Sequence, residues 1–293
     1  MDYQKELKEL KPEHEYFIGI DSDGCIFDSM EVKQKEFFIP NALKFFDLYA
    51  ISETLRETWE FVNLYSMHRG GNRFISMIKV FDLLNRRGEV KNSGCLIPDM
   101  TSLKAWVKVE TKLGNDSLRE YFRSHYDQDL ERVLRWSEAV NDDIARYLHN
   151  IPSFPHAIDA LKKITSYADL VIVSQTPLEA LNREWEEHDL KKYVKIIAGQ
   201  EHGTKAEHIN LSAKGKYHDN KILMIGDAKG DLDAARKNGI LFYPIIPGEE
   251  DKSWERFLNE GIQKFTGGTY SGIYEEKLLE EFNKSLPGTP PWQ

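Results

Sequence analysis

The sequence predicts an α/β protein with a doubly wound parallel sheet and an all-helical domain inserted after the first strand. Short apolar runs indicate strands, helical patterns separate the later runs, and a long stretch without a strand pattern follows the first run. Most of these runs are continuous rather than alternating, which is typical of strands covered by helices on both faces. Strand alternating with helix favours a parallel, Rossmann-like sheet. The predicted strands are residues 16–20, 170–173, 194–198, 221–225 and 241–246.

The predicted domain order is a first core part at 1–30, a helical domain at 31–150 and a second core part at 151–293. Within the helical part, apolar residues recur at spacings of three and four, the mark of amphipathic helices. The residues concerned are Leu55, Trp59 and Val62; Phe74, Met77, Phe81 and Leu84; and Val133, Trp136, Val140, Ile144 and Tyr147. Residues 152–155 (PSFP) are expected to form the return linker, and the C-terminal GTPPWQ is expected to be loose.

Composition limits the classes of partner. The 293 residues carry a formal net charge of -9, which opposes non-specific binding to nucleic acid or to an anionic membrane. The two cysteines, Cys25 and Cys95, form no zinc pattern and no disulfide framework. No apolar run has the length of a signal peptide or of a membrane span. We therefore expect a cytoplasmic protein whose partner is a small molecule.

The first chemical signal follows the first predicted strand. That strand delivers Asp21 and Asp23 to its carboxyl end, where open α/β sheets bind ligands. Two carboxylates so close together repel each other unless a cation lies between them. Gly24 allows the chain to turn sharply. Away from the end of a strand, Asp21 and Asp23 would indicate only an ordinary turn.

The second signal is the segment Gly226–Asp231 (GDAKGD), directly after the fourth predicted strand. Magnesium prefers oxygen ligands, usually one or two carboxylates with water and phosphate. Asp21 and Asp227 can supply such carboxylates. Asp231 also has a structural interpretation as the cap of the helix that follows.

Two weaker signals lie at the ends of the second and third predicted strands. Ser174 and Gln175 stand at a strand-to-helix turn, where a hydroxyl and backbone amides can bind phosphate. The alternative for Ser174 is an ordinary N-cap. Lys205 follows Thr204, an expected N-cap, and can balance the carboxylates, although Lys214 and Lys216 are rivals for this role. All four signals follow parallel strands at one sheet edge, so we expect them to converge.

This pattern resembles the haloacid dehalogenase-like hydrolase superfamily, in its phosphatase and phosphoglucomutase branch with a helical cap between the first two motifs. DSDGCIFDS is similar to the first motif, Ser174 to the second, Lys205 to the third and GDAKGD to the fourth. The second motif has Ser-Gln where Ser-Asn is frequent, and Lys205 precedes alanine where proline is frequent.

The resemblance implies a role for each residue. Asp21 would attack phosphorus and form an aspartyl-phosphate, while Asp23 would protonate the leaving oxygen and then activate water. Mg²⁺ would be held by Asp21, by Asp227 and by the Asp23 backbone carbonyl. Further roles are implied for Asp231, which would orient the metal shell, and for Ser174 and Lys205, which would hold phosphoryl oxygens.

The helical insert offers one substrate-binding candidate, the stretch His68–Arg73, in which two glycines interrupt two helical patterns. Asn72 is expected to cap the second helix, and Arg69 and Arg73 near its N-terminus would favour an anion. The alternative is a solvated turn whose arginines pair with surface acids. Trp59, Phe61 and Trp136 are expected in the core rather than at the substrate.

Several functions stay compatible with these motifs. The leading hypothesis is a magnesium-dependent phosphatase acting on small phosphorylated metabolites. A phosphomutase would use the same residues but exclude water. A receiver-like signalling module, which holds an aspartyl-phosphate without catalysis, would place its phosphorylated aspartate later and lack a helical insert. A degenerate, non-catalytic scaffold is the last alternative. The sequence specifies neither an individual substrate nor an oligomeric state.

Overall fold

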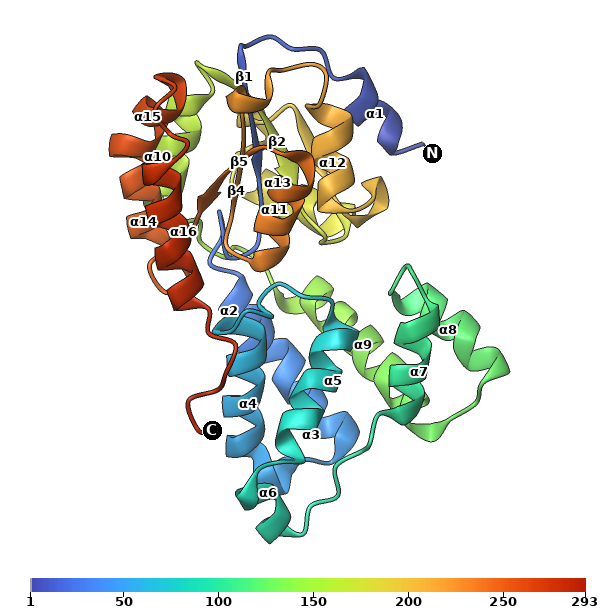
Figure 1. Ribbon diagram of the computed structural model, residues 1–293. Helices are drawn as coiled ribbons and strands as arrows, with labels where there is room; N and C mark the ends of the chain where they lie inside the picture. The colour runs from blue at the N-terminus through green and yellow to red at the C-terminus, as the bar shows by residue number, and fades with distance from the viewer. Residues whose placement is uncertain (1) are drawn as a thin grey trace. The chain divides into compact units, whose positions relative to one another are not determined.

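The computed structural model describes residues 2–293 as two compact units (Figure 1). Within the described residues, the sheet unit comprises 2–30 and His149–Pro287, and the helical unit comprises Glu31–Leu148 and Gly288–Gln293. All strands belong to the sheet unit, and the residues of the helical unit form none. None of the helices within residues 2–293 is long and apolar enough to cross a membrane.

The sheet has five strands in the order β3-β2-β1-β4-β5, and every neighbouring pair is parallel. This confirms the predicted fold class. Because β1 is the central strand, its carboxyl end lies between those of β2 and β4. The strands are β1 (Tyr16–Ile20), β2 (Ala168–Val173), β3 (Ile196–Ala198), β4 (Ile222–Gly226) and β5 (Leu241–Pro244).

Both faces of this sheet are buried, which accounts for the continuous apolar runs. Along β1, Ile18 and Ile20 join one apolar cluster while Phe17 joins another. The first cluster includes side chains of α10 (Pro155–Ile164), α14 (Glu250–Arg256) and α15 (Ile262–Thr266). The second includes side chains of α1 (Gln4–Glu9), α12 (Lys205–Ser212) and α13 (Lys229–Asn238). Figure 1 shows α10, α14 and α15 on one side of the strands and α1 and α12 on the other. Fully burying one such side chain stabilises the fold by about 1.5–3 kcal/mol.

The helices of the sheet unit largely follow the predicted pattern. α13 ends at Gly239, whose φ of 64° is left-handed as expected for a glycine after a helix. α11 ends at Glu187, two residues before Asp189, whose φ of 54° is left-handed and does not continue a helix. The helices are α1 (Gln4–Glu9), α10 (Pro155–Ile164), α11 (Leu178–Glu187), α12 (Lys205–Ser212), α13 (Lys229–Asn238), α14 (Glu250–Arg256), α15 (Ile262–Thr266) and α16 (Ile273–Ser285).

The helical unit has its own core, in which Trp59, Phe61 and Trp136 are buried as expected. The three periodic patterns lie on α4, α5 and α9, but Tyr147 at the end of α9 is exposed rather than buried. A π-helical segment, Lys33–Phe38, joins α2 to α3. The helices are α2 (Met30–Val32), α3 (Ile39–Phe46), α4 (Ser52–Leu64), α5 (Arg73–Leu84), α6 (Gly88–Ser93), α7 (Thr101–Val109), α8 (Asn115–Ser124) and α9 (Gln128–Tyr147).

The return linker pairs with the segment that leaves the sheet unit. The Asp28 amide donates to the carbonyl of Pro152, and the Phe154 amide donates to the carbonyl of Ile26, at 3.0 and 2.9 Å. α10 then begins at Pro155, a favoured first position for a helix. The outgoing and returning segments are therefore tied together at the base of the first motif.

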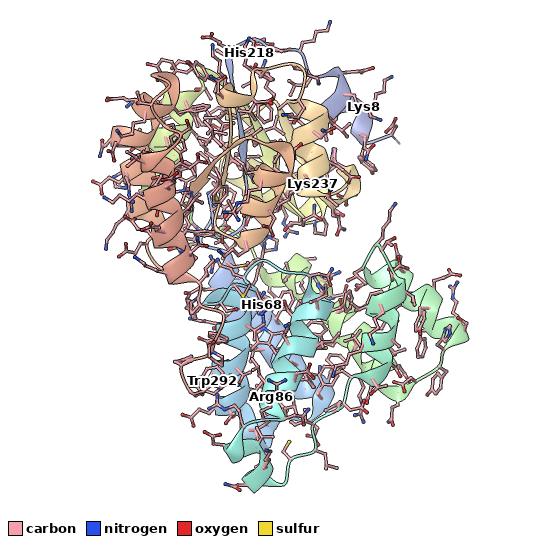
Figure 2. All side chains as sticks on the ribbon, viewed as in Figure 1. Lys8, His68, Arg86, His218, Lys237 and Trp292 are labelled. Atoms are coloured by element: carbon pink, nitrogen blue, oxygen red, sulfur yellow. The ribbon has the colours of Figure 1, made fainter. Side chains whose placement is uncertain are left out.

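The C-terminal segment differs from the sequence prediction in two respects. Residues 288–293 belong to the helical unit, not to the second core part, and they are not loose. The Trp292 ring lies edge-on to Phe61 with centroids 5.4 Å apart, and the Arg87 guanidinium carbon lies 4.4 Å from the ring centroid (Trp292 is labelled in Figure 2). An aromatic side chain with such partners anchors a short tail that lacks any helix or strand.

Candidate active site

The first motif forms a compact turn at the end of β1. The Asp21 amide donates to the carbonyl of Ile225, so it continues the pairing with β4, and the Ser22 amide donates to Oδ1 of Asp21 at 2.8 Å. The Ser22 carbonyl accepts from three later amides of the turn. Gly24 has a φ of 71°, which favours glycine. The buried Asp21 and the half-buried Asp23 are thus presented at the carboxyl edge of the sheet.

Two buried tryptophans support this turn, and sequence reasoning missed both. The Trp185 indole donates to Oγ of Ser22 at 3.0 Å, and the Trp254 indole donates to the carbonyl of Cys25 at 2.6 Å. These tryptophans lie on α11 and α14, far along the chain from the turn. No local sequence signal links them to it, because the contacts arise only when the helices pack on the sheet.

Three carboxylates converge at the ends of β1 and β4. Asp21, Asp227 and Asp231 are buried, and each offers an oxygen within 4.8 Å of the others. Oδ2 of Asp231 also accepts from the Ala228 amide at 3.1 Å, so this residue both caps α13 and joins the cluster. A Cβ atom at Gly226 would lie 2.4 Å from Cγ of Asp231. The glycine before Asp227 therefore leaves the space that the Asp231 carboxylate fills.

Lys205 neutralises part of this charge. Its ammonium donates to Oδ2 of Asp21 and to Oδ1 of Asp231, both at 2.6 Å. Lys205 is the first residue of α12, whose N-cap is Thr204, as expected from the sequence. The rival lysines lie elsewhere: Lys214 donates to Asp219 and to the carbonyl of Asn238, and Lys216 donates to carbonyls of α1.

The charge balance of the cluster fits a divalent cation. Burial raises the pKa of Asp21 from 3.8 to about 6, opposed by Lys205 and reinforced by Asp227. Burial likewise raises the pKa of Asp231 to about 6. Burial lowers the pKa of Lys205, but Asp21 and Asp231 outweigh it and hold that pKa above its ordinary value. Three buried carboxylates face one ammonium here, and carboxylate oxygens are the ligands that Mg²⁺ prefers.

Ser174 lies at the end of β2 and is buried. Its Oγ accepts from the Thr176 amide at 3.1 Å, which leaves its own proton available for a phosphoryl oxygen. It is not the N-cap of α11, since Pro177 occupies that position. Gln175 is exposed, and its amide donates to the carbonyls of Ser174 and Gly203. The predicted contact of Gln175 with a substrate stays a prediction.

Asp23 accepts hydrogen bonds on both carboxylate oxygens. Oδ1 accepts from the hydroxyl of Ser29 at 2.5 Å, and Oδ2 accepts from the hydroxyl of Thr176 at 2.7 Å. Ser29 lies at the end of the first motif, while Thr176 follows β2. Sequence reasoning did not single out Thr176, because its link to Asp23 spans 153 residues.

The candidate residues of the helical unit make hydrogen bonds within that unit. The Arg69 guanidinium is buried and donates to the carbonyl of Leu64 at 3.0 Å. The Arg73 guanidinium donates to Oγ of Ser137 at 3.0 Å and to Oδ1 of Asn141 at 2.7 Å, and burial lowers its pKa to about 10.

Asn72 caps α5 as expected, since its Oδ1 accepts from the Phe74 amide at 3.0 Å. Its side-chain amide donates to the carbonyl of Leu113 at 3.1 Å. The neighbouring His68, labelled in Figure 2, lies in the connection between α4 and α5. Contact of Arg69, Asn72 and Arg73 with a substrate stays a prediction.

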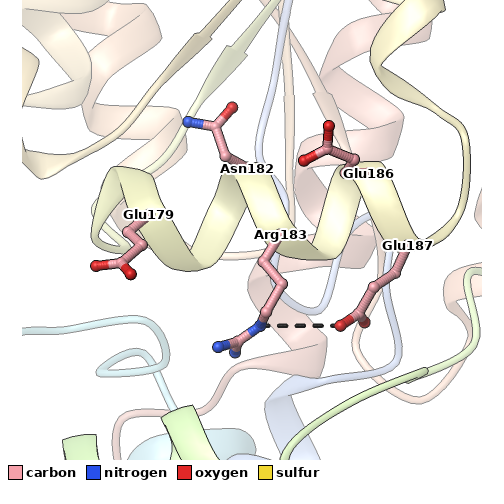
Figure 3. A pocket seen from close by; sticks show the side chains of 5 residues that line it. All are labelled: Glu179, Asn182, Arg183, Glu186 and Glu187. Atoms are coloured by element: carbon pink, nitrogen blue, oxygen red, sulfur yellow. Dashed lines mark ion pairs between the residues drawn. The ribbon is translucent and has the colours of Figure 1, made fainter.

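An open hollow of about 570 Å³ lies on one side of α11 (Figure 3). Arg183 and Glu187 form an ion pair in it at 3.9 Å. None of the residues expected at the catalytic site lines this hollow. Its lining consists of Glu179, Asn182, Arg183, Glu186 and Glu187.

Comparison with known proteins agrees with this arrangement. Residues 102–245 match the family model described as haloacid dehalogenase-like hydrolase. The matched region contains Ser174, Lys205 and the cluster residues Asp227 and Asp231, and it begins after the first motif. No curated protein matches the sequence significantly.

Several solved structures align with most of the chain at low identity. A predicted phosphoglycolate phosphatase from Haemophilus somnus aligns with 18% identity and a TM-score of 0.48, over 80% of this chain and 86% of that chain. A haloacid dehalogenase-like hydrolase from Xanthomonas campestris aligns with 10% identity and a TM-score of 0.46, over 90% and 97%. A predicted phosphatase from Clostridium acetobutylicum aligns with 17% identity and a TM-score of 0.43, over 92% and 100%.

The likeness to haloacid dehalogenase-like hydrolases is carried by the motifs, by the sheet that brings them together and by the family-model match. The parallel sheet presents Asp21, Ser174 and Asp227 directly after β1, β2 and β4, and Lys205 begins α12, the helix that follows β3. Residues 102–245, which carry three of the four motifs, thus match the haloacid dehalogenase-like hydrolase family.

Proposed function

We propose that this chain is a magnesium-dependent phosphatase that hydrolyses phosphate monoesters of small metabolites through an aspartyl-phosphate on Asp21. The observation that carries the proposal is the buried Asp21 carboxylate at the end of the central strand, with Lys205 bound to its Oδ2. A nucleophilic carboxylate needs a nearby positive charge before a phosphate dianion can approach it. Lys205 supplies one such charge directly at the nucleophile.

In the first step, an Asp21 oxygen forms a bond to phosphorus while the bond from phosphorus to the leaving oxygen breaks. Asp23 donates its proton to that oxygen, so the product alcohol departs neutral. The Ser174 hydroxyl and the Lys205 ammonium bind phosphoryl oxygens as charge redistributes during transfer.

In the second step, a water molecule attacks the same phosphorus atom. Asp23, now a carboxylate, takes a proton from that water, and the bond from phosphorus to the Asp21 oxygen breaks. Inorganic phosphate leaves, Asp21 returns as a carboxylate and Asp23 is protonated again. Atoms and protons therefore balance over one turnover, and the sum is ester hydrolysis.

Asp21, Asp227 and Asp231 are the side chains that would hold Mg²⁺, together with the backbone carbonyl of Asp23. The cation supplies charge neutralisation between the anionic nucleophile and the anionic phosphate. The excess negative charge of the buried carboxylates supports this part of the proposal.

The test is phosphate release from a panel of phosphorylated metabolites and an aryl phosphate, with Mg²⁺ or with chelator. Wild type should release phosphate only with Mg²⁺, and Asp21→Asn should lose at least about a thousandfold in rate, because the covalent step is removed. Asp219→Asn, an exposed aspartate paired with Lys214, is the matched control and should keep the wild-type rate.

Two outcomes would reject the proposal. One is a wild type that releases no phosphate from any ester, and the other is an Asp21→Asn variant that keeps its rate. If a bisphosphate activator instead produces isomerisation of a sugar phosphate without free phosphate, the chain is a phosphomutase.

A further inference from the structure

We propose that Thr176 is a positioning residue for Asp23: its hydroxyl orients the Asp23 carboxyl group toward the leaving oxygen of the substrate. This inference rests on the proposed phosphatase function and adds a residue that the four motifs do not include. The contact that carries it is the hydrogen bond from Oγ1 of Thr176 to Oδ2 of Asp23, at 2.7 Å.

Asp23 needs such a contact because it lies on a turn and is only half-buried. The hydrogen bond from Ser29 holds one carboxyl oxygen, Oδ1. The bond from Thr176 holds the other oxygen, Oδ2, from a different segment of the chain and restricts rotation of the carboxyl plane about the bond to its Cβ. The hydroxyl of Thr176 therefore contributes to the direction in which the carboxyl oxygens point.

Thr176 is itself held on both sides of its backbone. Its amide donates to Oγ of Ser174 at 3.1 Å, and its carbonyl accepts from the Gln200 amide at 3.1 Å. A Cβ atom at Gly199 would lie only 2.7 Å from that carbonyl oxygen. The loops after β2 and β3 are thus packed closely, and the hydroxyl of Thr176 is presented from a rigid backbone.

A hydroxyl suits this task in both halves of the reaction. It can donate to a carboxylate and accept from a carboxylic acid, so the contact can persist when Asp23 gains or loses its proton. Valine has nearly the same shape as threonine but can do neither. Serine keeps the hydroxyl and loses only a methyl group.

The experiment varies the leaving group. It thereby distinguishes a loss of proton donation by Asp23 from a general disturbance of the site. An alkyl phosphate such as glycerol 2-phosphate needs a proton on its leaving oxygen, whereas the nitrophenolate of p-nitrophenyl phosphate leaves without one. For Thr176→Val, the single-turnover rate of alcohol release from the alkyl ester should fall about 10- to 100-fold. A displaced proton donor, here the Asp23 carboxyl group, lowers the rate by about that factor. The nitrophenolate burst of the same variant should stay within about threefold of wild type.

Two further variants complete the design. Thr176→Ser should recover the alkyl-ester rate to within about threefold, since it restores the hydroxyl. Thr165→Val, which removes a hydroxyl bonded to the Lys162 carbonyl at the end of α10, should leave both rates unchanged. Thermal melting of each variant, with and without Mg²⁺, checks that the sheet unit is folded.

The outcomes distinguish this inference from the proposed function. If wild type turns over both esters and Thr176→Val loses the two rates equally, or loses neither, the positioning role is wrong while the phosphatase stands. If Thr176→Ser is as impaired as Thr176→Val, the hydroxyl is not the cause and the role is again wrong. A wild type that releases no phosphate from any ester of the panel rejects both.

Discussion

The ammonium of Lys205 lies 2.6 Å from Oδ2 of Asp21. One residue follows the central strand and the other begins α12, and 184 residues separate them in the chain. The same ammonium also binds Asp231, so a single cation links the predicted nucleophile to the fourth motif. The electrostatics of the site therefore depend on this lysine.

Replacing Lys205 with methionine should affect both catalysis and stability. Loss of a charge at the phosphoryl group should lower kcat by about 10²–10³-fold. Leaving two buried carboxylates without their counter-charge should cost about 3–5 kcal/mol of unfolding free energy in the metal-free protein. Urea denaturation in chelator measures the second effect. Lys216→Met is the control, and equal losses in the two variants would contradict the assigned role.

Gly226→Ala should weaken Mg²⁺ binding by at least about tenfold, because the new Cβ atom would displace the Asp231 carboxylate. Calorimetric titration with Mg²⁺ gives the dissociation constant without any need for activity. Gly230→Ala is the matched control, since a Cβ atom there meets nothing within 4 Å. It lies in α13 and should bind Mg²⁺ normally while gaining about 0.5–1 kcal/mol of stability. Unchanged binding in Gly226→Ala would refute this steric explanation.

Asp169, at the start of β2, should stabilise the folded protein at neutral pH, and this stabilisation should be lost in acid. Burial raises its pKa, but hydrogen bonds from His14, from the Glu13 amide and from Tyr217 outweigh it and hold the pKa at about 2, below the ordinary 3.8. Because the folded-state pKa is depressed, the stabilisation is full above pH 3.8 and is lost as the pH falls toward 2.

Asp169→Asn should therefore lose roughly 2–4 kcal/mol at neutral pH, and the deficit should shrink below pH 4. Unfolding free energies measured between pH 7 and pH 3 give this difference. Asp159→Asn, an exposed aspartate paired with Lys162, should show no comparable deficit. A deficit that is independent of pH would show that the charge of Asp169 is not responsible.

Trp292→Ala should destabilise the region of the helical unit that the tail covers. The substitution removes the ring packed against Phe61 and Arg87, at a cost of about 1–3 kcal/mol. Hydrogen exchange followed by mass spectrometry should show faster exchange in α4, which carries Phe61. Gln293→Ala is the control, and unchanged protection of α4 would mean that the tail contributes no stability.

The sheet and the strand-end acids could be predicted because each depends on local sequence. Continuous apolar runs specify strands buried on both faces, and a parallel sheet places their carboxyl ends at one edge. Thr204 and Asn72 were predictable as N-caps because a cap bonds to residues two or three positions away. Within the helical insert, α6 and α8 each bury a single residue and gave no periodic pattern.

The contacts that orient the site were not predictable. Trp185 and Trp254 reach the turn after β1 from α11 and α14, and nothing near them in the sequence marks that role. The capping role of Asp231 was expected from the sequence, whereas its ion pair with Lys205 emerged only from the packed structure. The tail was misjudged because its composition lacks any local structure, whereas its order comes from a single ring on the helical unit.

The sequence alone determined which residues stand at strand ends, the parallel α/β core, the helical insert and the resemblance to a known family. Those properties follow from local patterns of burial, turn and cap along the chain. Tertiary structure alone decided which lysine meets Asp21, which hydroxyls hold Asp23 and which tryptophans support the turn. Apart from the contact of Ser29 with Asp23, each of these contacts joins residues more than 150 positions apart. Their distances depend on how helices and loops pack around the sheet, which no local pattern encodes.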